Sequence, residues 1–213
     1  MNETSPLVFF HNPHSRACMT RALLEELGVA YELCTIDFRN NEQLSPEYRA
    51  INPMGKVPTI RHGGDVITET VAIFVYLADR FRAAGLAPDL DDPQRGSYLR
   101  WLVFYAACFE PALSDRAMKR EPAPRAQSPY ADFDTVVGTL TDQLDKGPYL
   151  LGERFTAADV LWASALRWVT GFGLLQATPR ITSYIERVTS RPAQQRAAEL
   201  DLALAKEMGL PVA

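Results

Sequence analysis

Cysteine is scarce in this sequence of 213 residues, which contains only Cys18, Cys34 and Cys108. The number is odd and the three are widely spaced, so we expect neither a disulfide framework nor the paired spacing of a zinc site. Free thiols of this kind are typical of a reducing compartment, and we therefore expect a cytoplasmic protein without a metal ion. We interpret each cysteine as a small buried hydrophobic residue.

Long apolar runs and an excess of positive charge are also absent. The first apolar run, residues 7–10, is too short for a signal peptide, and no uncharged stretch approaches the length of a transmembrane helix, so we expect no membrane association. The formal net charge of −4 argues against nucleic acid as a partner, because nucleic acid rewards a basic surface. A small anionic ligand is compatible with this charge, since it needs only a few local donors.

Hydrophobic residues are plentiful, at 47% of the sequence, and in the first part of the chain their spacing alternates between strand and helix patterns. Residues 7–10 form a continuous apolar run, as expected of a strand that is covered on both faces. Residues 19–27 carry an apolar residue at every fourth position and predict a helix that ends at Gly28. Residues 31–37 predict a second strand, so the first two strands should lie parallel with a right-handed crossover.

A hairpin and a second helix complete this part of the chain. Residues 56–67 predict two strands that turn at Gly63 and Gly64, and a helix is predicted from Glu69 onward. The stretch before the hairpin shows no regular pattern and is predicted to be a loop. The expected order is therefore strand, helix, strand, loop, strand, strand, helix.

The segment 85–96 has the composition of a linker, because it combines two prolines with glycine and three aspartates. Beyond it the sequence predicts helices only, at 97–120, at 130–146, after Thr156, at 181–188 and at 192–206. Thr156 and Asp159 have the spacing of a capping box, which marks a helix start. We therefore predict an α/β domain at residues 1–84, a linker at 85–96 and an all-helical domain at 97–213.

Four stretches of the chain resemble the cytosolic glutathione transferase superfamily in their order and spacing. They are the opening turn and helix NPHSRACMTRALLEELG, the segment INPMGKVPTI, the helix start TETVAIFVYLADRF and the capping-box segment GERFTAADVLWASALRW. The resemblance covers nearly the whole chain, and the rest looks most like bacterial members of the serine or cysteine type. It implies a thioredoxin-like first domain (βαβ-ββα) that binds glutathione, followed by a bundle of helices.

The resemblance places glutathione beside Val57 and Pro58. In the family a cis proline precedes the third strand, and the backbone before it pairs with the cysteinyl part of glutathione as if with an added strand. Lys56, one residue earlier, is a candidate for binding the glycyl carboxylate of glutathione. The alternative for Lys56 is a solvated surface charge.

Glu69 and Thr70 begin the helix after the hairpin, where free N–H groups and the positive end of the helix dipole favour a carboxylate. Thr70 can add a hydroxyl donor and Glu69 can accept from an ammonium group, which together match the γ-glutamyl end of glutathione. The family has a Glu-Ser or Gln-Ser pair here, and threonine keeps the hydroxyl. A plain helix cap is the alternative interpretation.

Polar residues crowd the turn between the first strand and the first helix, which carries the sequence HNPHSRAC. A helix start with a hydroxyl or amide donor can stabilise a sulfur anion, so we expect this turn to contact the glutathione thiolate. Ser15 is the first candidate, because serine-type members carry the hydroxyl at or next to this position, and Asn12 is the second. His14, Arg16 and a backbone N–H remain open, and Cys18 is interpreted as a packed thiol.

The resemblance implies an enzyme that joins the glutathione thiolate to hydrophobic electrophilic small molecules, as in detoxification, with glutathione as co-substrate and no metal. It also implies a homodimer. Two alternatives stay open: a glutathione-dependent thiol–disulfide reductase or isomerase, and a non-catalytic binding protein that reuses the fold. The first would need a reactive cysteine in the turn. The second would have no need of the Val57–Pro58 and Glu69–Thr70 pairs.

Overall fold

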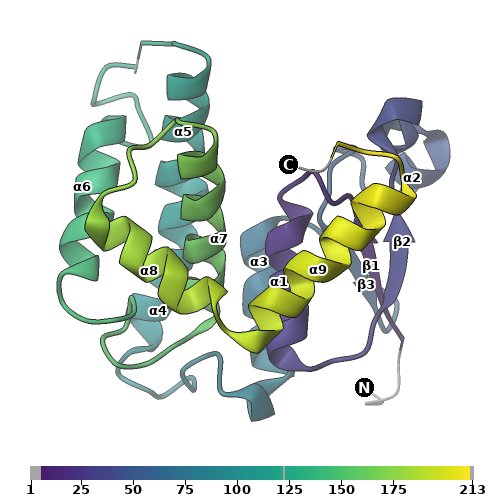
Figure 1. Ribbon diagram of the computed structural model, residues 1–213, viewed down its shortest axis with the longest axis horizontal. Helices are drawn as coiled ribbons and strands as arrows, with labels where there is room; N and C mark the ends of the chain where they lie inside the picture. The colour runs from purple at the N-terminus through teal and green to yellow at the C-terminus, as the bar shows by residue number, and fades with distance from the viewer. Residues whose placement is uncertain (1–5, 122, 212–213) are drawn as a thin grey trace. The chain divides into compact units, whose positions relative to one another are not determined.

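The computed structural model describes residues 6–121 and 123–211, which divide into two compact units (Figure 1). The first unit comprises the chain up to Ala84 together with the segment from Pro192 onward. The second comprises Gly85–Arg191 and contains helices but no strand among its described residues. None of the described helices is both long enough and apolar enough to cross a membrane.

The first unit is built on a four-stranded mixed sheet in the order β2-β1-β3-β4. The strands are β1 (Leu7–His11), β2 (Glu32–Thr35), β3 (Thr59–His62) and β4 (Asp65–Ile67). β2 pairs with β1 in parallel, whereas β3 runs antiparallel to both β1 and β4. The predicted parallel pair and the predicted hairpin are both confirmed.

Buried side chains on both sides of β1 explain its uninterrupted apolar run. Val8 and Phe10 belong to a cluster with Ile36 and Tyr48 on one side of the sheet. Phe9 alternates to the other side, as successive residues of a strand do, and is fully buried. Both faces of β1 are therefore covered, and no position in the strand is left for an exposed polar residue.

Two helices of the first unit match the predicted pattern, and a third was not predicted. α1 (Ala17–Leu27) ends at Gly28, whose φ of 65° is the left-handed conformation that glycine adopts at helix ends. α3 (Thr70–Arg80) follows the hairpin. The predicted loop instead contains α2 (Pro46–Ile51) and two short 3-10 turns, Phe38–Asn40 and Glu42–Leu44. A further 3-10 turn, Arg82–Ala84, follows α3.

The last helix, α9 (Pro192–Glu207), belongs to the first unit, which differs from the predicted helical domain at 97–213. α9 packs along α1, and Figure 1 shows the two helices side by side. The physical reason is a set of polar contacts that α9 makes with α1. Gln194 donates to Glu26 at 3.1 Å and Arg196 donates to Glu25 at 2.8 Å.

The second unit contains α4 (Arg95–Phe104), α5 (Glu110–Ala117), α6 (Phe133–Leu144), α7 (Ala157–Gly171) and α8 (Pro179–Thr189). The helix predicted at 97–120 is in fact α4 and α5 joined by a π-helical turn, Tyr105–Phe109. Trp162 lies fully buried among the aromatic rings of this stretch. Its indole N–H donates to the Trp101 carbonyl at 2.9 Å, so the polar atom of this core side chain is satisfied.

The segment predicted as a linker, 85–96, is anchored to the second unit. The Leu86 carbonyl accepts from the Ala157 N–H at 2.8 Å, at the start of α7. Arg154 forms an ion pair with Asp92 at 2.6 Å. The capping box predicted at Thr156 and Asp159 is confirmed, with both reciprocal hydrogen bonds present. The Leu86 and Asp92 contacts attach the segment to the part of the helical unit around the start of α7.

Candidate functional site

Strand register brings the three predicted site segments to one end of the sheet. Phe10 pairs with Thr59, so Pro58 lies beside the last residue of β1 and the turn that follows it. Ile60 pairs with Ile67, so the chain leaving β4 toward Glu69 emerges at the same end. The polar turn, the Val57–Pro58 pair and the Glu69–Thr70 pair are therefore neighbours because of topology, although they are far apart in sequence.

The side chain of Asn12 makes two hydrogen bonds to the backbone within the fold. Its amide N–H donates to the Ile36 carbonyl at 2.8 Å, and its amide oxygen accepts from the His14 N–H at 2.9 Å. Only 2% of the residue is exposed. Asn12 therefore ties the turn to the chain that follows β2, and a ligand that took either group would break one of these two hydrogen bonds to the backbone.

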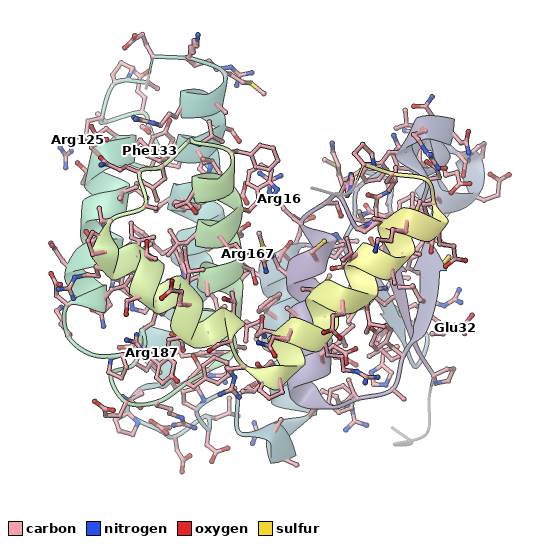
Figure 2. The ribbon with its side chains drawn as sticks, viewed as in Figure 1. Arg16, Glu32, Arg125, Phe133, Arg167 and Arg187 are labelled. Carbon is pink, nitrogen blue, oxygen red and sulfur yellow. The ribbon has the colours of Figure 1, made fainter. Side chains whose placement is uncertain are left out.

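Ser15 lies half-buried immediately before α1, and its hydroxyl has two contacts. It donates to the Asn12 carbonyl at 2.7 Å and accepts from the Ala17 N–H at 3.1 Å. A serine hydroxyl can rotate about its C–O bond, so its proton can leave the Asn12 carbonyl and turn toward an anion while the oxygen keeps the Ala17 contact. Arg16, labelled in Figure 2, sits at the N-cap position of α1 without a side-chain capping bond.

The peptide bond between Val57 and Pro58 is cis, as the resemblance implies. Within the described part of the chain, the Val57 backbone makes no hydrogen bond, which leaves it available to an extended peptide. The Lys56 carbonyl is held by the Tyr48 hydroxyl at 2.5 Å and by the Asn52 amide at 2.9 Å. Tyr48 and Asn52 thus hold the chain at Lys56, just before the cis bond, while the Val57 backbone groups stay free.

Tyr48 and Asn52 were missed from the sequence because they belong to α2 and its end. A local signal was present: Ser45 followed by Pro46 is a common helix start, and the Ser45 hydroxyl accepts from the Tyr48 N–H at 3.1 Å. The Lys56 side chain, in contrast, is exposed and forms no ion pair with any described residue. Its proposed contact with a carboxylate stays a prediction.

Glu69 has an unusual backbone at the N-cap position of α3. Its φ is 65° and its ψ is 116°, a conformation that is rare for a residue with a side chain. Strain of this kind costs about 1–3 kcal/mol and concentrates at functional sites. The Glu69 side chain is exposed and caps no backbone group of its own helix, and the half-buried Thr70 follows it as the first residue of α3. A plain helix cap therefore does not account for Glu69.

A buried ionic cluster lies beneath the polar turn. The Asp201 carboxylate on α9 contacts the His11 Nε2 at 2.6 Å and the Arg21 guanidinium at 2.9 Å. Burial lowers the pKa of His11, against the raising effect of Asp201, and this favours the neutral imidazole. His11 is the last residue of β1 and Arg21 belongs to α1, so Asp201 links the two elements that flank the turn.

Cys18 belongs to the same cluster and behaves as a packed thiol. Its Sγ donates to the Pro13 carbonyl at 2.9 Å, and burial, with Asp201 nearby, raises the pKa of the thiol. In the described residues, Cys18, His11 and Asp201 are the one group that could hold a metal, with ligand atoms within 4.8 Å of one another. The Arg21 guanidinium already occupies the carboxylate, which makes this a poor cation site, and the absence of a metal stays a prediction.

Two family models match the chain. Residues 5–79 match the N-terminal domain of glutathione S-transferases, and residues 123–187 match their C-terminal domain. The first range covers all three segments that the sheet brings together. The second covers the capping box and most of the helical unit.

Similar proteins align along most of the chain. Glutathione S-transferase 1 of Schizosaccharomyces pombe is 30% identical over 200 residues, 83% of this chain and 87% of that protein. The disulfide-bond oxidoreductase YfcG of Escherichia coli is 29% identical over 188 residues, 82% of this chain and 86% of that protein. The crystal structure of a glutathione transferase homologue from Sulfitobacter with bound glutathione is 26% identical, with a TM-score of 0.71 over 97% of this chain and 99% of that one. Agreement at this level in sequence and fold shows that the chain belongs to the cytosolic glutathione S-transferase superfamily.

Proposed function

We propose that the protein is a glutathione S-transferase that conjugates the glutathione thiolate to electrophilic, hydrophobic small molecules. In this reaction the sulfur forms a bond to an electrophilic carbon, and the leaving group departs with the electron pair of the bond that breaks. The observation that carries the proposal is the strained, exposed Glu69 at the start of α3, at the same end of the sheet as the free backbone of Val57. A scaffold with no ligand gains nothing from that strain.

Residues 56–58 and the Glu69–Thr70 pair would bind the three amino-acid parts of glutathione. The Val57 backbone next to the cis Pro58 would pair with the cysteinyl residue, as an added strand does. Glu69 would accept from the α-ammonium group, while Thr70 and the first N–H groups of α3 would bind the α-carboxylate. Lys56 would face the glycyl carboxylate.

Activation of the thiol is assigned to the polar turn. A free thiol has a pKa of about 8.5, so only about 3% is thiolate at pH 7. Lowering this pKa by about 2 units requires about 2.7 kcal/mol of preferential binding to the anion. The Ser15 hydroxyl and the start of α1 can supply this, since a hydrogen bond to a charged group contributes about 1.5–3 kcal/mol.

Replacing Glu69 with alanine should weaken glutathione binding at least tenfold, because one charge-assisted contact worth about 1.5–3 kcal/mol is lost. Glu69→Gln removes the negative charge and keeps the size of the side chain. Its loss of glutathione affinity should be nearly as large as that of Glu69→Ala. Glu47→Ala is the matched control, because Glu47 is an exposed acid in the first turn of α2 in the same unit. Titration calorimetry measures all three, and unchanged affinity in Glu69→Ala would remove Glu69 from the site.

Replacing Ser15 with alanine should raise the pKa of bound glutathione by about one to two units, since one hydrogen bond to the thiolate is lost. The pH–rate profile with a generic aromatic electrophile should move to higher pH by the same amount, with little change in glutathione affinity. Asn12→Ala should instead lower the stability of the protein, because the Ile36 carbonyl and the His14 N–H lose their partner. A profile that moves in Asn12→Ala and stays in place in Ser15→Ala would assign the donor to the amide.

Thiol–disulfide exchange is the second candidate function, because one similar protein carries the name disulfide-bond oxidoreductase. The turn of this chain presents the Ser15 hydroxyl, and the Cys18 thiol is held by the Pro13 carbonyl with a raised pKa. Both features favour conjugation. Turnover of a small glutathione mixed disulfide that exceeds turnover of every electrophile tested would reverse this preference.

We expect the protein to work as a cytoplasmic homodimer. The three cysteines are free, and exposed apolar side chains such as Leu44 and Met54 in the first unit suit an interface between copies. Sedimentation at micromolar concentration should give about twice the 23.8 kDa of one chain. A species with the mass of one chain would contradict the dimer and leave the proposed chemistry intact.

A further inference from the structure

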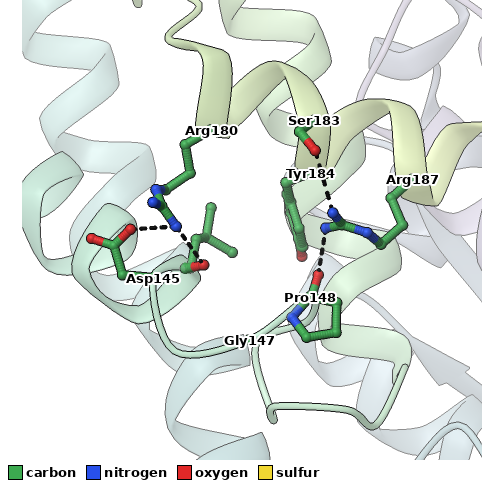
Figure 3. A pocket seen from close by; sticks show the side chains of 8 residues that line it. Asp145, Gly147, Pro148, Arg180, Ser183, Tyr184 and Arg187 are labelled. Carbon is green, nitrogen blue, oxygen red and sulfur yellow. Dashed lines mark hydrogen bonds and ion pairs between the residues drawn. The ribbon is translucent and has the colours of Figure 1, made fainter.

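A cavity between the loop after α6 and one face of α8 gathers several charged side chains of the helical unit (Figure 3). Each of them is engaged within the fold: Arg180 forms an ion pair with Asp145, and Arg187 donates to the Pro148 carbonyl at 2.9 Å. These contacts hold the loop against α8 and give both arginines a structural role. The polar turn before α1 carries a side chain that has no structural role of this kind, the imidazole of His14.

His14 is the exposed histidine of the chain. The other two, His11 and His62, are buried, and their rings contact the Asp201 carboxylate at 2.6 Å and the Tyr76 hydroxyl at 2.8 Å. The His14 ring, in contrast, is exposed and makes no hydrogen bond or ion pair with any described residue. A titratable group in the proposed site is therefore left without a structural partner.

The backbone of His14 is fixed, although its ring is exposed. The His14 N–H donates to the Asn12 amide oxygen at 2.9 Å, and the Asn12 amide N–H donates to the Ile36 carbonyl at 2.8 Å. Pro13, between them, is buried, and its carbonyl accepts from the Cys18 thiol at 2.9 Å. The His14 ring therefore extends from a well-anchored turn at the end of the sheet where glutathione is proposed to bind, which distinguishes it from a histidine on a loose surface loop.

The proposed conjugation needs a proton acceptor, because the glutathione thiol must lose its proton before the sulfur attacks carbon. The residue types at positions 12–18 offer one candidate. The Asn12 amide and the Ser15 hydroxyl are not basic at neutral pH, and Arg16 stays protonated. Cys18 is itself a protonated thiol, since burial raises its pKa. Histidine is the side chain that ordinarily gains and loses a proton between about pH 5 and 8.

We propose that His14 is the general base of the reaction and accepts the thiol proton of glutathione. One ring nitrogen takes the proton, and the electron pair of the sulfur–hydrogen bond stays on the sulfur as the thiolate that Ser15 stabilises. The thiolate then bonds to the electrophilic carbon, the leaving group departs with its electron pair, and the imidazolium returns its proton to water. The inference rests on the proposed function, because it requires the glutathione sulfur beside Ser15.

The charged groups at this end of the sheet set the direction of the proton transfer. His14 and Ser15 are consecutive, so their Cα atoms lie about 3.8 Å apart, and a sulfur held by the Ser15 hydroxyl is next to the residue that carries the ring. A thiolate there favours the imidazolium, and so does Glu69, whereas the positive charges of Arg16 and Lys56 oppose it. Since the thiolate is present only when glutathione is bound, the ring gains its proton only in the complex.

The first test follows the histidine rings by NMR in the full chain with ¹⁵N-labelled histidine, at about pH 7.5, where an ordinary histidine is about 90% neutral. Glutathione should move the His14 ring signals toward the imidazolium position. S-methylglutathione is the matched control, because it keeps the groups that bind the tripeptide but has no thiol proton, and it should leave the ring neutral. The buried rings of His11 and His62 are internal controls and should keep their protonation state with both ligands.

The second test compares thiolates with released protons. His14→Gln keeps a polar side chain of similar size that cannot accept a proton, and it should bind glutathione with nearly unchanged affinity. In the natural protein, the ultraviolet absorbance of the bound thiolate should report more thiolates than protons released to the solution, since His14 holds the difference. In His14→Gln less thiolate should form at the same pH, and one proton should be released for each thiolate.

Neither test uses an electrophile, so a failure of conjugation would count against the proposed function alone. A His14 ring that stays neutral when glutathione binds, or that responds equally to S-methylglutathione, would overturn the inference. Equal numbers of thiolates and released protons in the natural protein would overturn it as well.

Discussion

Replacing Asp159 with alanine is expected to lower the free energy of unfolding by about 3–5 kcal/mol, among the largest effects of any single change in this chain. The fully buried carboxylate accepts from the Leu150 N–H at 2.8 Å, the Thr156 N–H at 2.9 Å, the Thr156 hydroxyl at 3.2 Å and the Tyr184 hydroxyl at 2.9 Å. Each buried donor that loses its partner costs about 1–3 kcal/mol, and water entering the space recovers part of that sum. The change therefore loosens the loop before α7, the start of α7 and α8 together.

Urea denaturation at pH 7 measures the expected loss, with Asp142→Ala as the control. Asp142 is an exposed acid on α6 without a partner among the described residues, so its replacement should change stability by no more than about 0.5 kcal/mol. A loss in Asp159→Ala as small as that in Asp142→Ala would show that the four hydrogen bonds contribute little.

The pH dependence of Asp159 gives a second check on the same carboxylate. Burial raises its pKa to about 6, against the lowering effect of its hydrogen bonds. The folded state therefore holds a proton that the unfolded chain releases near pH 4, so the contribution of Asp159 to stability falls as the pH rises from about 4 to about 6. The difference in free energy of unfolding between the natural protein and Asp159→Asn should shrink over that window. A constant difference would contradict the raised pKa.

Local patterns predicted most of the fold correctly. The apolar run of β1, the glycine that ends α1 and the capping box of α7 depend on neighbouring residues and on general rules of strand and helix geometry. α2 was missed because six residues are too few to show a helical period, and only Ser45–Pro46 marks its start. The π-helical turn at Tyr105–Phe109 was missed because it continues the apolar pattern of the helices on either side.

Long-range contacts account for the rest of the differences. No feature near residue 201 indicates that its carboxylate meets His11 and Arg21, since pairing between distant segments has no local signal. For the same reason the sequence left Ser15 and Asn12 as alternatives. The two side chains differ in their contacts: the Asn12 amide bonds the Ile36 carbonyl and the His14 N–H, whereas the Ser15 hydroxyl donates to the Asn12 carbonyl and accepts from the Ala17 N–H. The choice between them stays a prediction.

The contact between α9 and the polar turn leads to the second large effect. Replacing Asp201 with leucine should lower the free energy of unfolding by about 3–5 kcal/mol, because the Arg21 guanidinium would then be a buried charge without a partner. The Arg21 side chain is only 3% exposed and that of His11 is fully buried, so neither can reach water without opening the helix pair. Glu199→Leu, at an exposed position of α9, should have little effect on stability.

The double variant Arg21→Leu/Asp201→Leu tests whether the buried charge is the cause. Replacing both partners of a buried ion pair with apolar residues is often close to neutral, so the double variant should recover at least half of the stability that Asp201→Leu loses.

The order of the turn that carries Ser15 should not recover together with the stability. Asp201 connects the last residue of β1 to α1, and the turn that carries Ser15 lies between them in the chain. Without this connection the turn is held less firmly. Hydrogen exchange at the Ala17 and Cys18 amides should therefore be faster in both variants than in the natural protein. Double-variant stability no higher than that of Asp201→Leu would show that α9 is held by shape rather than by charge, and unchanged exchange would show that the turn is fixed by Asn12 alone.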